Sequence, residues 1–245
     1  IYGGSYSACM MQLYFRTLPI VISAFILLFC AIVLSIMYLK YLRKLPGLNK
    51  SGFLALILLA LYLGVWLMNV KGGLQFFISS PYIIYFISAF SFLILPVPFN
   101  VFLYSLCQGR FKKGFLLFAW IFTGTILLNW VWQLFTPLDM FYLKPFTYLL
   151  MLLNFIYALT ACIHETAKHK NRAAKSCLLP LLLLGFSAAF YVLLLFLDGE
   201  TTIFPYLITY ILVISYVIFV RIFVHRYSTA QAEAKQARYY RELAL

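Results

Sequence analysis

The strongest constraint on this chain is a series of seven apolar segments, each about 18–25 residues long, that are joined by short loops. An α-helix rises about 1.5 Å per residue, so each segment can cross a hydrocarbon layer about 30 Å thick. The expected spans cover residues 18–39, 53–70, 82–106, 115–134, 146–163, 177–197 and 203–224. Charged residues make up only 10% of the chain, against about 25% in a soluble domain. The sequence therefore predicts an all-α, seven-helix transmembrane bundle in contact with membrane lipid.

The positive charges predict the orientation of this bundle. The loops after the first, third and fifth spans, together with the tail, hold all but three of the 19 Lys and Arg residues; the other three are Arg16, Lys71 and Lys144. Cytoplasmic loops of membrane proteins carry such an excess. We expect the amino end outside and the tail inside. Membrane topology then explains the net charge of +13, and no nucleic-acid partner is expected.

The tail after the last span predicts a helix that continues from the membrane into water. No Gly or Pro occurs from Ile222 to Leu245, and no stop signal ends the helix. Ala230, Ala234 and Ala237 have the spacing of a coiled-coil seam. We expect a signalling helix that forms a homodimer through this seam; the alternative is an inert stalk.

A pair of prolines interrupts the third span. Pro96 and Pro98 remove amide donors and free carbonyl groups one turn earlier. Asn100, one turn after Pro96, could bond those carbonyls. We interpret Pro96, Pro98 and Asn100 as a candidate hinge, with a static packing kink as the alternative.

Polar and aromatic residues gather near the expected outer ends of the second and fourth spans. The candidate ligand pocket is formed by Trp66, Asn69, Asn129, Trp132 and Gln133. An interfacial aromatic belt is the alternative for the tryptophans, and hydrogen bonds between helices are the alternative for Asn129. The ligand is unknown.

Motifs for chemistry are missing from the sequence. It has no phosphate-binding loop, triad spacing or paired carboxylates, so no catalytic, cofactor or metal site is predicted. His164 and His169 are five residues apart and do not share a helix face, so the segment around Glu165 is interpreted as a solvated basic loop. Cys107, Cys162 and Cys177 fall near one membrane face, where packing or acylation could explain them.

Two short segments resemble a known family. Residues 240–244 are similar to the lead-in helix of GGDEF (diguanylate cyclase) domains, and residues 1–5 resemble the last strand of an extracytoplasmic sensor domain. With the proline pair and the seven spans, the layout resembles that of bacterial seven-transmembrane receptors with diverse intracellular signalling modules.

The resemblance implies a module of a longer protein. Residues 1–16 would end, or lead in from, an extracytoplasmic domain; residues 17–224 would form the transmembrane sensor domain; and residues 225–245 would link it to a missing cytoplasmic output domain. The expected function is signal relay across a bacterial plasma (inner) membrane, to a diguanylate cyclase. This chain itself is then no enzyme. The alternatives are the sensor region of a histidine kinase and a small-solute membrane transporter.

Overall fold

A computed structural model describes residues 6–42, 50–70, 73–135, 144–196 and 204–243. All secondary structure in these ranges is helical. The α-helices are α1 (Tyr6–Met37), α2 (Lys50–Val70), α3 (Pro81–Ile94), α4 (Pro96–Leu106), α5 (Lys112–Phe135), α6 (Lys144–His169), α7 (Arg172–Phe196) and α8 (Phe204–Leu243). A π-helical turn, η1 (Tyr38–Leu42), extends α1, and a 3₁₀ turn, η2 (Gly73–Phe76), follows α2.

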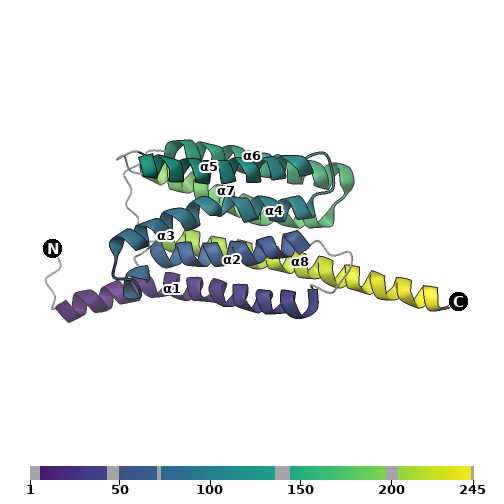
Figure 1. The fold of residues 1–245 in the computed structure, drawn as a ribbon, viewed down its shortest axis with the longest axis horizontal. Helices are drawn as coiled ribbons and strands as arrows, with labels where there is room; N and C mark the ends of the chain where they lie inside the picture. Colours follow the sequence, from purple (N-terminus) through teal and green to yellow (C-terminus); the bar gives the residue numbers. More distant parts are fainter. Residues whose placement is uncertain (1–5, 43–49, 71–72, 136–143, 197–203, 244–245) are drawn as a thin grey trace.

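The long helices run side by side along the long axis of the molecule (Figure 1). The described residues include six helical segments that are long and apolar enough to cross a membrane. These segments are Thr17–Lys40, Lys50–Val70, Pro81–Leu106, Lys112–Gln133, Pro145–Lys168 and Tyr206–Arg226. The remaining expected span, 177–197, falls largely on α7, where side chains beyond Ser187 lie outside the described part. The structure therefore confirms an all-α bundle with multiple membrane-spanning candidates.

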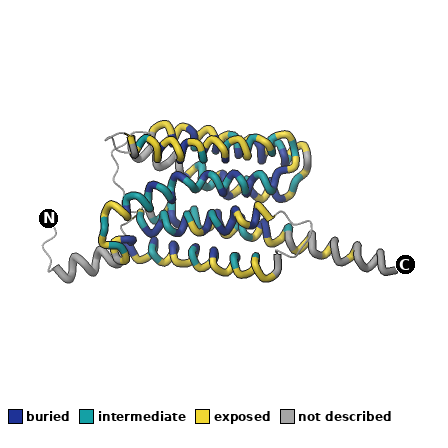
Figure 2. The backbone as a smooth tube through the Cα atoms, viewed as in Figure 1, coloured by how far each residue is buried: buried dark blue, intermediate teal, exposed yellow. Residues whose placement is uncertain are grey.

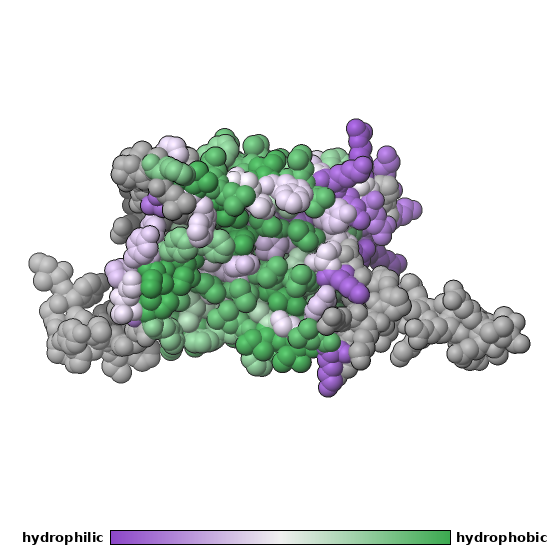
Figure 3. Space-filling model, in the orientation of Figure 1, coloured by the Kyte–Doolittle hydropathy of each residue, from purple (hydrophilic) through white to green (hydrophobic). Residues whose placement is uncertain are grey.

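The outer surface of the bundle is apolar. Exposed residues line the outward faces of the helices (Figure 2), and large side chains such as Phe29, Trp120 and Phe186 are at least 66% exposed. Contiguous exposure of this kind is costly in water and fits contact with lipid. Hydrophilic side chains gather at the end of the bundle from which α8 projects (Figure 3).

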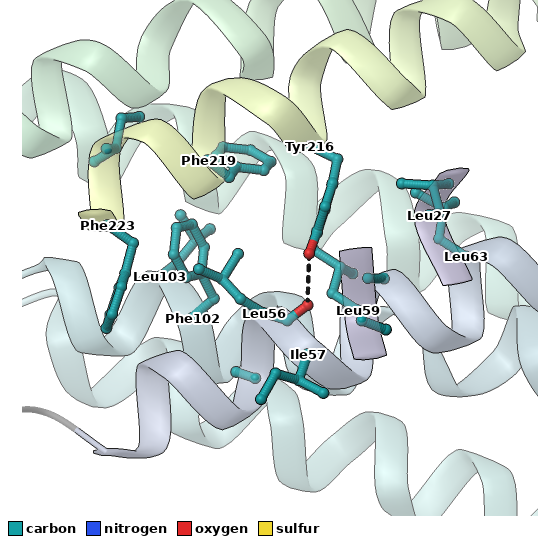
Figure 4. Close-up of a cluster of buried hydrophobic side chains, with 14 of the residues drawn as sticks. Leu27, Leu56, Ile57, Leu59, Leu63, Phe102, Leu103, Tyr216, Phe219 and Phe223 are labelled. Atoms are coloured by element: carbon teal, nitrogen blue, oxygen red, sulfur yellow. Dashed lines mark hydrogen bonds between the residues drawn. The ribbon is translucent and has the colours of Figure 1, made fainter. Parts of the chain in front are cut away.

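The core takes buried side chains from all eight α-helices of the described part, and aromatic rings of α8 lie within it. Tyr216, Phe219 and Phe223 of α8 pack toward side chains of α2 and α4, including Leu56 and Phe102 (Figure 4). The ring centroids of Phe102 and Phe219 are 5.2 Å apart. This packing holds the last span in the middle of the bundle.

The third expected span consists of two helices, as the proline pair predicted. Helix α3 ends at Ile94, Leu95 stands between the helices, and α4 begins at Pro96. The two helices meet at an angle (Figure 1). The single prolines Pro19 in α1 and Pro180 in α7 lie inside helices that continue through them.

The first membrane-spanning segment is Thr17–Lys40, close to the expected span of residues 18–39. The helix itself begins earlier, at Tyr6, so Pro19 lies in its interior. The strand expected in residues 1–5 lies outside the described part. At the other end, α8 runs for 40 residues from Phe204 to Leu243, as the absence of Gly and Pro predicted.

Candidate functional site

Three parts of the chain meet at the end of the bundle from which α8 projects. They are the loop between α4 and α5, the turn between α6 and α7, and the part of α8 around Arg226. We call this meeting point the Glu165 junction and define it by Leu106, Gly109, Glu165, Asn171 and Arg226.

Glu165 is the centre of the junction. It lies near the end of α6 and its side chain is 0% exposed. One carboxylate oxygen accepts a hydrogen bond from the backbone N–H of Gly109 at 2.5 Å, and the other accepts one from Gln108 at 3.4 Å. A buried carboxylate is costly unless such donors surround it. Glu165 therefore ties α6 to the loop that follows α4.

Asn171 joins the same loop from the other side. Its side-chain oxygen accepts hydrogen bonds from the N–H groups of Ala173 and Ala174, which caps the start of α7. Its amide nitrogen donates to the carbonyl oxygen of Leu106 at 3.0 Å. Lys170, just before it, has a φ of 49°, the left-handed conformation that often ends a helix. The tight turn between α6 and α7 is thus bonded to the end of α4.

Arg226 connects α8 to this end of α4. Its guanidinium donates to the carbonyl oxygens of Ser105 and Leu106, both at 3.4 Å. These carbonyls belong to the last turn of α4, where the helix dipole favours a cation. Every element of the junction therefore reaches the last turn of α4 or the loop after it.

Three cysteines lie beneath the junction. Cys107, Cys162 and Cys177 are buried, as the packing interpretation expected. A hydrogen bond with the Cys162 thiol, followed by burial, raises the pKa of Cys107. Cys107 therefore stays protonated and is a poor nucleophile at neutral pH.

Exposed basic residues surround the junction. Those with exposed side chains in the two connections are Arg110, Lys113, Lys168, Lys170, Arg172 and Lys175. Among the loops after the first, third and fifth expected spans, Glu165 is the only acidic residue in the sequence. The interpretation of its segment as a solvated loop was wrong for Glu165, because α6 continues to His169 and turns the carboxylate inward. A lone acid among many bases was the available signal.

The candidate pocket residues make local contacts. The Trp66 ring packs on Phe92 of α3, with centroids 5.8 Å apart. Asn129 is buried and its side-chain amide donates to the Thr125 carbonyl oxygen of its own helix. Asn69 and Trp132 are half-buried and Gln133 is exposed. Trp66 packs against a neighbouring helix, while the hydrogen bond of the Asn129 amide is within α5 rather than between helices. The pocket stays a prediction.

The three candidate hinge residues lie in the first turns of α4, and the hinge itself stays a prediction. Pro96, Pro98 and Asn100 are all buried. The amide of Asn100 donates to the carbonyl oxygen of Pro96 at 2.8 Å, in its own helix. It does not bond Phe92, whose carbonyl oxygen instead accepts the N–H of Leu95 at 3.4 Å. The prediction for Asn100 was therefore wrong, because its amide bonds the Pro96 carbonyl oxygen one turn earlier in its own helix.

The coiled-coil seam and metal binding are two further points that depend on side-chain positions. The backbone of Ala230, Ala234 and Ala237 lies within α8, while their side chains lie outside the described part. Among the described side chains, no group of three His, Cys, Asp or Glu residues is placed to hold a metal ion.

Comparison with known proteins gives no relative. No family model matches the chain, and no characterised protein or solved structure is significantly similar to it. The fold, with its six long apolar helices, indicates a multi-pass helical membrane protein.

Proposed function

We propose that this chain is the membrane sensor and transducer module of a signalling receptor. In this proposal seven helices cross a bacterial plasma membrane, with the amino end outside and the basic end in the cytoplasm. A signal from outside, or from a ligand within the bundle, shifts the helices. The tail of α8 relays the shift to a cytoplasmic output domain, which we propose is a diguanylate cyclase; a histidine kinase is the second candidate.

The continuity of α8 is the observation that carries this proposal. Its apolar segment, Tyr206–Arg226, continues without a break to Leu243. At about 1.5 Å per residue the helix is about 60 Å long, and it projects well beyond the bundle (Figure 1). A continuous helix carries a displacement that a flexible linker would absorb.

The Glu165 junction supports a relay because it bonds α8 to elements that could move. Arg226 is bonded to the last turn of α4, and that turn follows the break at Leu95. Glu165 and Asn171 bond α6 and α7 to the same region. A change in the angle between α3 and α4 would therefore reach the start of the tail.

The clustering of basic side chains supports the proposed orientation, since lysines and arginines of separate connections gather at the end where α8 leaves (Figure 3). Labelling of single cysteines with a membrane-impermeant maleimide tests it. We expect a cysteine at Lys170 to be protected in intact cells and to react after the membrane is opened. Labelling of Lys170→Cys in intact cells would contradict the orientation.

Disulfide crosslinking in native membranes tests the proposed dimer. Single cysteines at Ala230, Ala234 and Ala237 should give crosslinked dimers, because these positions share one helix face. Ala232 and Gln236, on the opposite face, are the matched controls and should crosslink weakly. Equal crosslinking at all five positions, or none at the three seam positions, would rule out the seam.

A small-solute transporter is the second candidate. The break between α3 and α4 favours it, because transporters often use broken helices at their binding sites. Solute uptake into vesicles containing the purified chain separates the two candidates, since a transducer module should move no solute.

A further inference from the structure

Three buried polar side chains inside the bundle have an oxygen atom without a hydrogen-bond partner among the described residues. They are Asn100 of α4, Asn154 of α6 and Ser215 of α8, with exposed fractions of 0%, 4% and 1%. The unpartnered atoms are Oδ1 of both asparagines and Oγ of the serine. An unpaired buried polar group costs about 1–3 kcal/mol, so three of them in one bundle require an explanation.

The orientation of Asn100 is fixed by its other amide atom. Its Nδ2 donates to the Pro96 carbonyl oxygen at 2.8 Å, so exchanging the two amide atoms would set oxygen against oxygen. Ser215 is also unusual, because the hydroxyls of Ser105 on α4 and Ser228 on α8 donate back to a carbonyl of their own helix. The unpartnered oxygens of Asn100 and Ser215 are therefore not used within their own helices.

The register of the helices places Asn100 and Ser215 at similar depth. Residues 215, 219, 222 and 226 follow one face of α8. On this face the Phe219 ring packs on both Phe99 and Phe102 of α4, and Arg226 bonds the last turn of α4. Ser215, one turn before Phe219, therefore lies about level with the first turn of α4, within about 6 Å in depth of Asn100.

Asn154 reaches the same depth from α6. It shares a face with Ala158, Ala161 and Glu165, and all four are buried. Glu165 is bonded to Gly109, just beyond the end of α4. Asn154 precedes Glu165 by eleven residues, or about 17 Å of helix, and this also places it at the level of the first turn of α4. Three helices thus hold unpartnered oxygens at one level of the bundle.

The helix break adds a further feature that favours positive charge at this level. Helix α3 ends at Ile94, immediately before α4. Pro98 removes the N–H that would otherwise bond the Ile94 carbonyl oxygen. The C-terminal end of a helix carries a partial negative charge, and the ends of broken helices bind small cations in other membrane proteins.

We propose that Asn100, Asn154 and Ser215, beside the end of α3, form a binding site for a monovalent metal cation within the membrane. All the offered ligands are oxygen atoms, as alkali-metal ions require. Divalent ions are disfavoured because they usually take carboxylate ligands, and Glu165, the only carboxylate with a described side chain, is about 17 Å away along α6. This site is independent of the proposed relay function.

Thermal unfolding of the purified full chain in detergent tests the site. The probes are NaCl and KCl, each compared with choline chloride at equal ionic strength. Binding to the folded state raises the unfolding midpoint, and we expect a rise of about 4 °C or more with one of the two metal ions. Equal midpoints in all three salts would overturn the proposal.

Substitutions at the proposed ligands show whether these residues cause the rise in the unfolding midpoint. Ser215→Ala and Asn154→Leu should lose most of the rise with the metal ion. Ser91→Ala, at a buried serine bonded within its own helix, should keep it. A rise that persists in Ser215→Ala and Asn154→Leu would overturn the assignment.

A charge-adding variant keeps the test decisive if Asn154→Leu does not fold. Asn154→Asp brings a carboxylate to the site and should lower the half-saturating cation concentration about tenfold. An unchanged or higher concentration in Asn154→Asp would also contradict the site.

Discussion

The phenol of Tyr216 on α8 donates a hydrogen bond to the backbone carbonyl oxygen of Leu56 on α2, at 3.3 Å (Figure 4). The two bonded residues are 160 positions apart in the chain. Around it, the rings of α8 fill the space between α2 and α4. Tyr216 is 2% exposed, so this polar contact is made in the apolar core of the bundle.

Removing this hydroxyl should have a modest cost. Tyr216→Phe keeps the ring and loses one neutral hydrogen bond, so we expect the free energy of unfolding to fall by about 1 kcal/mol. Tyr210→Phe, on the exposed face of the same helix, is the control and should change stability little. Unfolding of both variants in detergent gives the comparison. Equal losses would show that the Tyr216 bond contributes nothing specific.

Loss of the Glu165 carboxylate should destabilise the junction strongly. Glu165→Ala leaves the N–H groups of Gln108 and Gly109 without their acceptor, and we expect a loss of about 3 kcal/mol. Glu165→Gln keeps one oxygen and should lose about half as much. Lys168→Ala, exposed one turn later, should change stability by less than about 0.5 kcal/mol.

These variants also separate two roles of the carboxylate. If Glu165→Gln and Glu165→Ala are equally unstable, the charge matters rather than the acceptor atoms. If neither differs from Lys168→Ala, the junction does not hold the helices together.

The contact between α2 and α4 depends on the absence of a side chain at Gly52. A Cβ there would overlap Ser105, whose hydroxyl is held by a 2.6 Å bond to the Phe102 carbonyl oxygen. We expect Gly52→Ala to cost about 1–3 kcal/mol. Gly124→Ala is the control, because a Cβ at Gly124 meets nothing within 4 Å.

A second substitution checks the cause of this loss. Ser105→Gly removes the two atoms nearest to a Cβ at Gly52 and leaves the Phe223 ring as the next nearest, at 3.3 Å. Adding Ser105→Gly to Gly52→Ala should therefore recover part of the lost stability. If Gly52→Ala is as stable as Gly124→Ala, the two helices are not in close contact at Gly52.

The hydrogen bond with Cys162 and the burial of the Cys107 thiol together raise its pKa, which predicts a loss of stability at alkaline pH. The folded protein holds the pKa of Cys107 above the ordinary thiol value of 9.0. Below that value both states keep the proton, and stability is fully present. As pH rises above it, the unfolded chain ionises first, and the folded state loses relative stability. Unfolding midpoints measured from neutral to alkaline pH should fall less steeply in Cys107→Ala than in the original protein. Parallel curves would contradict this prediction.

Local chemistry explains which parts of the fold the sequence predicted. The break in the third span follows from two missing N–H groups at Pro96 and Pro98. The continuity of α8 follows from a run without Gly or Pro. The apolar run lengths indicate membrane spans because lipid offers no partner for backbone polar groups. Each of these causes acts within a few residues and can be recognised without the tertiary structure.

Long-range contacts explain what the sequence could not predict. Glu165 is bonded to N–H groups 56 and 57 residues earlier in the chain, and nothing next to it in sequence indicates that a loop will cover it. The same holds for Asn154 and Ser215, whose shared depth depends on the register between three helices. A lone acid among bases and a lone amide in an apolar helix are the only local signs of such positions.

The proline pair itself gives the last prediction. Helices α1 and α7 each continue through a single proline, whereas the paired prolines separate α3 from α4. We therefore expect one proline to be insufficient for the break, so Pro98→Ala alone should largely rejoin the two helices. Spin labels at Ile83 on α3 and Lys113 on α5 report the change as a shift in the distance between them. An unchanged distance after replacement of both prolines would mean that tertiary packing, not the missing N–H groups, bends the chain. In the original protein, a broad or two-peaked distance distribution would support a hinge, and a single narrow peak would support a static kink.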